Sequence, residues 1–458
     1  MNPTNPMNPV EHPSHSRQKA RYALWRDLYR GGDCVEGRPE YLPRHPFETD
    51  RQYGIRLARS AYRNFAAPVV SVFHAAIWRK APLRRFGAAG PSPEVELILA
   101  DADRRGAPAD RFFGEATRRA AAAGIHFVLV DMPRLEEGRV PATLEEVREL
   151  GLRPYFVHVG AEQLVDWGFD LDTGELSYAV VAEEVEDSAG PFCGHGKVRR
   201  YRVYTREGWS VWREGAGGVE PTGLAGEHGL GRVPLVAFAF EEEEPMVGRA
   251  AHADIDSLVL RVYRRDSELD KALFDACVPI AVFSGFREEE VREFVRASSS
   301  GLLTENVEAH VTYVEPAGTS LARIREAILD DERSIREIAL RLVRPDSKAA
   351  ESAEAKRLDR SQLNARVSAF AQGCSRAETA CWRLAAAWLG QAVEVSVAYN
   401  QDYEAEEAGA ELARILSELS SGGLISRRTA LEGLKRLELL PGDFDPEAEL
   451  ARLGAGAK

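Results

Sequence analysis

The sequence predicts a mixed α+β fold, because helical and strand-like patterns occupy separate stretches of the chain. Residues 152–240 contain short runs of β-branched and aromatic residues, separated by Gly-rich or acidic breaks, which indicate a β-rich module. Over 253–276 and 319–342, apolar residues recur with the period of an amphipathic helix. The chain is therefore expected to be helical near its start, β-rich in its middle and helical again toward its end.

The most regular pattern in the chain begins at Leu363 and advances in alternating steps of four and three residues. Its members are Leu363, Val367, Phe370, Cys374, Ala377, Cys381, Leu384 and Trp388. This spacing predicts one long helix with a single packed face. Carried backwards, the same steps reach Arg360, Lys356 and Ala353, so the packed face is expected to begin only near Leu363.

Further elements are expected from the same patterns. They are a helix over 45–80, helices over 92–123 that end before Gly124, a buried strand over 125–133, a small α/β insert over 277–316 and a helical tail over 402–458. The first residues are rich in Pro and Asn and carry no apolar run. Residues 1–20 are therefore interpreted as a disordered arm rather than a signal peptide.

The composition argues against several classes of protein. With 458 residues, the chain suffices for about three domains. A net charge of −13 argues against a protein that coats nucleic acid, because phosphate binding needs clustered Lys and Arg. The five cysteines show no CxxC spacing, which argues against a disulfide scaffold or a zinc site and fits a reducing cytoplasm. The most apolar run, residues 120–130, is too short to span a bilayer, so a soluble protein is expected.

Two short motifs could carry chemistry. CGHGK places Cys193 close to His195, which would suit a hydrolase site, but it lacks phosphate-loop spacing and is interpreted as a turn between strands. Asp101, Asp103 and Asp131 could be imagined as metal ligands. The stretch DADRRG lacks the ligand spacing of a calcium loop, so it is interpreted as a solvated helix terminus.

Three other features have two interpretations each. His126 lies within an apolar strand and is interpreted as a satisfied core histidine rather than a ligand. The EEEE run at 241–244 could exclude or mimic DNA, but a solvated loop is favoured. LISRRTALEGLKRL at 424–437, with Ser426 as N-cap, resembles the helix-turn-helix of a DNA-binding regulator, but its acidic surroundings favour a packed helical hairpin. No catalytic constellation stands above chance, which favours an assembly role over an enzyme.

Blocks of sequence spread along the chain follow one another in an informative order. They are 41–82 (from YLPRHPFETD), 98–133 (from ILADADRRG), PYFVHVGAEQLVDW at 154–167, GRVPLVAF at 231–238, 258–286 (from LVLRVYRRDS), 351–390 (from ESAEAKRLDR) and the ISRRTALEGLKR tail. In this order they resemble the portal proteins of tailed bacteriophages and prophages, in a branch often described only as a domain of unknown function. The resemblance covers roughly residues 20–450, and the stretch EEEEPMVGRAAHADIDSL departs from it.

The resemblance implies a portal-type subunit without enzymatic activity, cofactor or metal. It implies a ring of about twelve copies at one capsid vertex of the virion, assembled in the host bacterial cytoplasm and not in a membrane. The implied partners are other copies of the chain, double-stranded DNA passing without sequence specificity, the terminase large subunit, major capsid and scaffolding proteins, and a head-completion adaptor. A cytoplasmic hydrolase with a site near Cys193 and His195 remains the alternative.

The resemblance also implies a division of the chain into named parts. After the arm at 1–20, these are a wing at 21–250, a stem helix at 251–276, a clip at 277–316, a second stem helix at 317–342, a tunnel loop at 343–353, a long wing-to-crown helix at 354–400 and a helical crown at 401–458. The fold expected in full is a mixed α/β wing, a two-helix stem carrying a small clip, a long helix and a helical crown.

The polar stretch at 343–360 gains an interpretation in this scheme. Pro345 disfavours helix at the preceding residue, and the stretch carries almost no apolar stripe. In a ring it would face a central channel, where water-compatible side chains need no core. The candidate channel residues are Arg344, Asp346, Ser347, Lys348, Glu351 and Lys356. Cations and carboxylates alternate among them, so the wall would contact a duplex without holding it.

Overall fold

The computed structural model describes most of residues 11–455, and the described part confirms the predicted α+β class. The chain divides into two compact units, Met1–Tyr399 and Asn400–Lys458. The residues outside the described part are 1–10, 89, 134–150, 188–195, 216–217, 277–279, 290, 293–305, 315–318, 344–352, 402–406, 437–439, 441–443 and 456–458.

Helix α1 (Pro13–Arg30) occupies part of the expected disordered arm, so that prediction was wrong for residues 13–20. A proline in the first turn and the His12 ring, which accepts a hydrogen bond from the Ser14 N–H, start the helix. The aromatic side chains that it buries are Tyr22 and Trp25. The helix is therefore part of the packed body of the first unit, and residues 1–10 of the arm lie outside the described residues.

The single helix expected over 45–80 consists of two helices, α2 (Asp50–Arg59) and α3 (Ala66–Ile77). Helix α2 begins at a capping box, in which the side chains of Thr49 and Gln52 each accept a hydrogen bond from the other residue's backbone N–H. It ends at Ser60, whose backbone is extended. Apolar residues recur on both sides of this break, so their period could not reveal it.

Five antiparallel strands form one sheet, in which each strand pairs with its neighbour in sequence. They are β4 (Leu164–Phe169), β5 (Leu176–Asp187), β6 (Gly196–Thr205), β7 (Gly208–Gly215) and β8 (Gly218–Glu227). The runs that suggested β5, β6 and β7 are strands, as expected. Strand β8 escaped prediction because glycines and Pro221 interrupt it.

A second antiparallel sheet has the order β3–β2–β9, where β2 (Ile125–Asp131) is the central strand. Its neighbours are β3 (Tyr155–Gly160) and β9 (Leu235–Ala239). Six of the seven residues of β2 are buried, which confirms the strand expected there. Helix α5 (Ala109–Ala123) packs on this sheet and is preceded by α4 (Pro93–Ala100).

Two glycines allow the chain to fold tightly after α5. Gly124 has a φ of 84°, and a Cβ on it would lie 2.6 Å from the carbonyl oxygen of Gly248. Gly248 belongs to a hairpin of β10 (Glu241–Glu244) and β11 (Val247–Arg249). The EEEE run is thus an exposed strand and not the loop that was expected.

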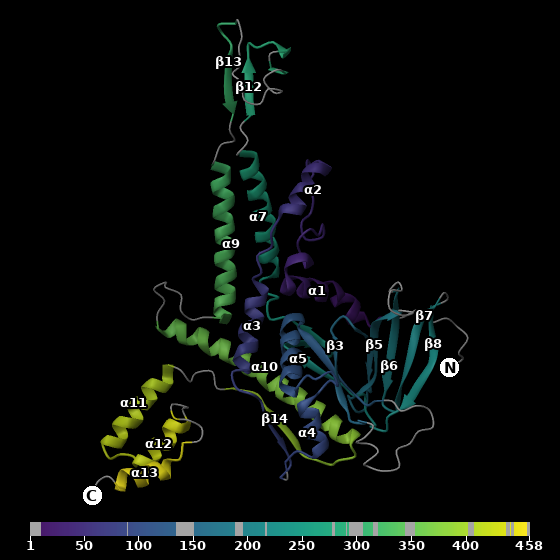
Figure 1. The fold of residues 1–458 in the computed structure, drawn as a ribbon, viewed down its shortest axis with the longest axis vertical. Coiled ribbons are helices and arrows are strands. Elements are labelled where there is room, and N and C mark those ends of the chain that lie inside the picture. Colours follow the sequence, from purple (N-terminus) through teal and green to yellow (C-terminus); the bar gives the residue numbers. More distant parts are fainter. Residues whose placement is uncertain are drawn as a thin grey trace. The chain divides into compact units, whose positions relative to one another are not determined.

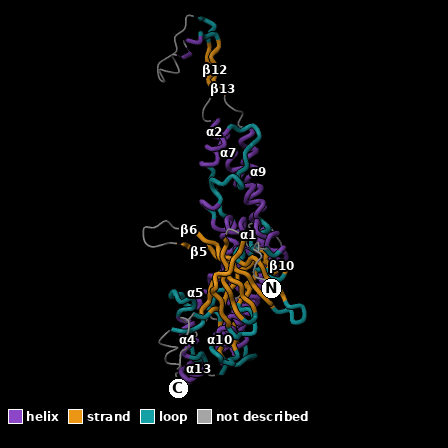
Figure 2. The backbone as a smooth tube through the Cα atoms, turned by 90° about the vertical axis from the view of Figure 1, so that its right-hand side faces the viewer, coloured by secondary structure: helices purple, strands orange, loops and turns teal. Residues whose placement is uncertain are grey.

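Two long helices, α7 (Asp256–Ala276) and α9 (Thr319–Val343), run side by side (Figure 1). Between them in sequence, β12 (Ile280–Ser284) and β13 (His310–Val314) pair antiparallel beyond the ends of both helices (Figure 2). The helix and strands expected around residues 287–305 fall largely outside the described residues. Helix α10 (Ala353–Trp388) follows α9 in the chain and packs on β9, β2 and α3.

The predicted stripe of α10 is confirmed as its packed face. Val367, Phe370, Cys374, Ala377, Cys381 and Leu384 are buried, and the two end members of the stripe are half-buried. A small sheet of β1 (Leu83–Phe86) and β14 (Val395–Ala398) lies against the same helix. Neither of these strands was expected, because four-residue strands that pair across most of the chain leave no local signal.

The second unit is helical, as expected for the tail. It contains α11 (Glu407–Ser421), α12 (Arg427–Arg436) and α13 (Pro446–Ala455). Ser426 caps α12 by accepting a hydrogen bond from the Thr429 N–H at 3.1 Å. A Cβ on Gly433 would lie 2.8 Å from Leu416, so α11 and α12 pack closely. The stretch 424–437 thus contains one helix, α12, which packs against both α11 and α13.

Candidate functional site

Helices α7 and α9 are joined by a buried carboxylate. Asp331 of α9 is 4% exposed and accepts hydrogen bonds from Arg261, with Nη2–Oδ1 at 2.5 Å, and from Arg265. Arg265 also donates to the carbonyl oxygen of Ala327 at 3.0 Å. These pairings run in opposite directions along the two helices, so the helices are antiparallel and their register is fixed.

A second ionic cluster ties the segment after α2 to both helices. Arg63 binds Asp266 of α7, with Nη2–Oδ2 at 2.7 Å, and also binds the buried Glu332 of α9. Arg336 reaches the same Glu332 at 2.7 Å. Burial raises the pKa of Asp266, and Arg63 opposes that shift. The helix pair is thus held to the body of the unit by charge pairing as well as by apolar contact.

The hairpin of β12 and β13 carries apolar side chains on its surface. Val282 is 41% exposed, and Val307, just before β13, is 98% exposed. Asn306 closes the described part of the insert by donating to the carbonyl oxygen of Gly285 at 2.9 Å. Exposed apolar residues at the end of a helix pair are suited to contact another protein.

The candidate channel residues fall where the structure gives least detail. Arg344, Asp346, Ser347, Lys348 and Glu351 lie outside the described residues. Lys356 belongs to α10, but its side chain is not among those described. Their placement in chain order is nevertheless clear, since they join the end of α9 to the first turns of α10. Their proposed role in a channel stays a prediction.

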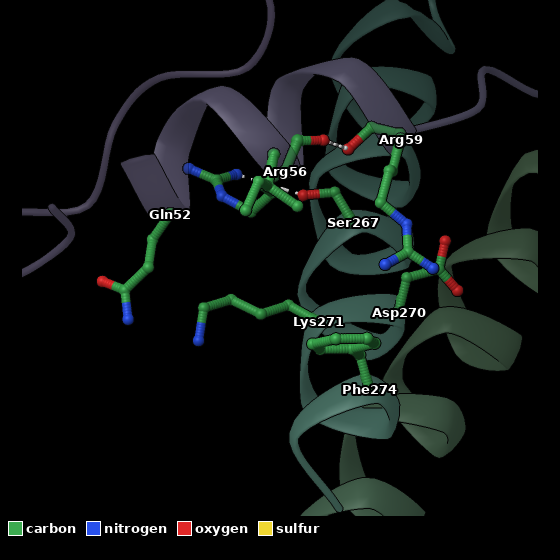
Figure 3. Close-up of a pocket in the computed structure, with 9 residues that line it drawn as sticks. Gln52, Arg56, Arg59, Ser267, Asp270, Lys271 and Phe274 are labelled. Carbon is green, nitrogen blue, oxygen red and sulfur yellow. Dashed lines mark hydrogen bonds between the residues drawn. The ribbon is translucent and has the colours of Figure 1, made fainter. Parts of the chain in front are cut away.

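A groove that sequence patterns did not indicate lies between α2 and α7 (Figure 3). Its volume is about 90 Å³, and Ile55 and Phe274 supply apolar walls. Arg56 lies behind it, 5% exposed, paired with Glu48 at 2.8 Å and donating to Ser267 Oγ at 3.1 Å. This side-chain pair fixes the floor of the groove, because both charges are buried and hydrogen-bonded.

The remaining sequence candidates have structural roles or lie outside the described residues. Cys193 and His195 are outside, in the segment that joins the paired strands β5 and β6. Asp101 accepts from the Gly106 N–H at 2.8 Å and pairs with Arg153, so it organises the loop after α4. Within the described ranges, no group of three or more His, Cys, Asp or Glu is placed to hold a metal ion.

His126 is confirmed as a satisfied core histidine. Its Nε2 lies 2.9 Å from Nδ1 of His158 on the paired strand β3, and the His158 ring stacks on Phe112. One nitrogen must donate and the other accept, so the accepting ring is neutral. Burial lowers the pKa of His126 well below its ordinary value and that of His158 to about 3, and Arg119 adds to both shifts.

This pair predicts a dependence of stability on pH. The ordinary pKa of histidine is 6.5, and the folded state lowers the pKa of both residues. Their full contribution to stability is therefore present above pH 6.5, and it is lost as the pH falls below that value. We expect the free energy of unfolding to drop below pH 6.5 by about 1.4 kcal/mol per pH unit for each histidine. Urea unfolding at pH 7.0 and 5.5 measures this slope. His158→Gln should reduce it, and an unchanged slope would contradict the assignment.

One segment of the chain matches a known protein family. Residues 253–389 match the model of a family described as Domain of unknown function (DUF4055), which spans α7, the insert, α9 and α10. This is less than a third of the chain. No curated protein matches the sequence. Within the described part, no helix is both long and apolar enough to cross a membrane.

Two solved structures with a distant likeness are necks of GTA particles. The neck of an empty GTA particle computed with C6 symmetry is 12% identical, with a TM-score of 0.42, over 80% of this chain and 88% of that one. The neck of a native GTA particle computed with C12 symmetry is 13% identical, with a TM-score of 0.40, over 81% and 90%. With TM-scores below 0.5, neither likeness determines the function of this chain.

Proposed function

We propose that this protein is a portal-type subunit, which forms a ring at one vertex of a tailed-phage or prophage particle. The observation that carries the proposal is the arrangement of α7, β12–β13, α9 and α10. An antiparallel helix pair bears a β-hairpin at one end and leads, at the other, into a 36-residue helix packed along one face. In this proposal the helix pair is the stem, the insert at 277–316 that includes this hairpin is the clip, and the tunnel loop at 343–353 borders the channel.

The order of sequence blocks supports the same proposal, since it resembles that of portal proteins along most of the chain. The charge pattern of the proposed tunnel loop adds to it, because alternating cations and carboxylates would let DNA slide. The proposed partners are DNA, the terminase large subunit, capsid and scaffolding proteins, and a head-completion adaptor. The subunit itself would perform no chemistry and would be part of the virion.

Exposed apolar residues on the helix pair support self-association. The apolar stripe of α7 is buried at Val259 and Val262, but Leu273, further along the stripe, is 44% exposed. Its neighbour Phe274 is 52% exposed, and Leu329 on α9 is 48% exposed. One copy of the chain therefore leaves part of the helix pair without apolar cover, as expected for a subunit of a ring.

Ring formation is the direct test of the proposal. Mass photometry of the purified protein should show a species near twelve times the 50.6 kDa monomer, or a neighbouring ring size. Closed cyclic symmetry, visible in negative stain, should accompany it. A protein that stays monomeric at micromolar concentration in every salt tested would contradict the proposal.

Shortening the insert should leave the fold and the ring intact but abolish the proposed docking of the packaging motor. Replacing residues 285–309 with a short Gly-Ser linker keeps β12 and β13, so rings of the shortened protein should still form. Packaging of DNA in a phage complemented with this variant should be abolished, because the proposed contact with the motor is gone. Packaging at the normal level would show that the insert is not the clip.

A further inference from the structure

The groove between α2 and α7 has features of a docking site for a side chain of another molecule. Ile55 is 48% exposed and Phe274 52% exposed, and both line it. The guanidinium of Arg59 lies 5.1 Å from the centroid of the Phe274 ring. Arg59 makes no ion pair with any described residue, and its guanidinium is on the side of the groove where Asp270 and Phe274 lie (Figure 3).

The groove offers one cation for an incoming carboxylate. Arg56 is balanced by Glu48, whereas Arg59 makes no ion pair with a described residue, and Asp270 is the one acidic residue among those that line the groove. Apolar walls with a positive rim would accept an apolar side chain that stands beside a carboxylate. The occupant should therefore present this pair of groups on one face of an element.

The outer face of α9 presents such a pair. Ile328, Asp331 and Ile335 point inward and are buried, whereas Glu326 and Leu329 are exposed. Residues three apart share one face of a helix, so this carboxylate and this apolar side chain stand together. Glu326 makes no ion pair within the described part of the chain.

Within one copy, these two surfaces cannot meet. The groove residues Ser267 and Lys271 share one face of α7, whereas Arg261 and Arg265, which bind α9, lie on average roughly 120° around the helix. Figure 1 shows α2 and α9 on opposite sides of α7. A groove on one side and a matching ridge on the other are what a head-to-tail ring interface requires.

We infer that the α2–α7 groove of one copy receives Leu329 of α9 from the next copy, with Glu326 of that copy paired to Arg59. This inference rests on the proposed ring and names the side chains that close it. The contact is heterologous, because the groove and the ridge are different surfaces. Repeated around the ring, it would join every stem to its neighbour.

Charge reversal tests the pairing. Arg59→Glu and Glu326→Arg should each raise the protein concentration needed for half-assembly at least tenfold, as measured by mass photometry. The double variant should return to within threefold of the original protein. Arg213→Glu with Glu220→Arg reverses an exposed pair on the five-stranded sheet and serves as the matched control, with no expected change. Circular dichroism of each variant checks that it is folded.

Disulfide cross-linking between copies tests the same contact without relying on variants that could fail to fold. Arg59→Cys combined with Glu326→Cys should, on mild oxidation, give a ladder of linked copies, whereas either change alone should not. Rings that form without a ladder and tolerate Arg59→Glu would overturn the inference while leaving the proposed function intact. Unaltered protein that forms no ring would instead overturn both.

Discussion

Replacing Phe370 with alanine is expected to lower the free energy of unfolding by about 3–5 kcal/mol. The side chain is 1% exposed and belongs to the packed face of α10. Its ring lies 5.0 Å from that of Phe240, which in turn meets Phe73 of α3 edge-on at 4.8 Å. Truncation would leave a cavity where α10, α3 and the end of β9 meet, and close-packed neighbours would fill it only in part.

The urea midpoint at one fixed protein concentration measures this effect, since assembly would otherwise shift it. Lys348→Ala and Lys356→Ala are the contrasting changes. Each should alter stability by less than about 0.5 kcal/mol, because the tunnel-loop interpretation places both charges in a channel, away from any core, and substitutions of exposed charges usually have effects of this size. They should change the rate of DNA packaging or its retention instead. Loss of the fold in Lys348→Ala, together with a normal Phe370→Ala, would show that the tunnel-loop interpretation is wrong.

The elements that could be predicted are those whose signal is local. The α10 stripe was readable because one face packs along most of the helix, and β2 because nearly all its residues are buried. Helix α1 was missed because six of its 18 residues are charged and few apolar side chains, Tyr22, Trp25 and Leu28, enter the core. The EEEE strand was missed because its residues favour a loop. It forms through pairing with β11 after a turn in which Met246 has a φ of 66°.

The candidate surfaces also differ in whether a local sequence signal predicts them. The helix pair and its hairpin could be expected from periodicity. The α2–α7 groove could not, because it joins residues about 200 positions apart. Leu273 continues the apolar stripe of α7 beyond the residues that the same copy buries, which signals an uncovered face of this helix, but it does not line the groove. The channel residues were chosen because they lack such a stripe, so their role depends on an assembly that a single chain does not contain.

The second large effect on stability is expected at Glu378, because this fully buried carboxylate joins three parts of the fold. Its side chain is 0% exposed and accepts hydrogen bonds from Arg84 Nε of β1 at 2.5 Å, Trp382 Nε1 at 3.0 Å and the Tyr399 hydroxyl at 2.5 Å. Burial, together with this carboxylate, raises the pKa of Tyr399 well above its ordinary value, so the tyrosine stays a donor. The long helix is thereby fixed to the sheet of β1 and β14.

We expect Glu378→Gln to lower the free energy of unfolding by about 3–5 kcal/mol, although it preserves the shape of the side chain. All three partners donate to the carboxylate, and an amide offers them only one acceptor oxygen, so at least one donor would lose its acceptor and Arg84 would keep only its ion pair with Asp110. Glu220→Gln, on an exposed pair, is the control and should cost less than about 1 kcal/mol.

Arg84→Met combined with Glu378→Leu should cost less than the sum of the two single changes, because removing both charges leaves neither one buried alone. Additive losses in urea unfolding would mean that Arg84 and Glu378 stabilise the protein independently and that the pair does not hold α10 to the sheet.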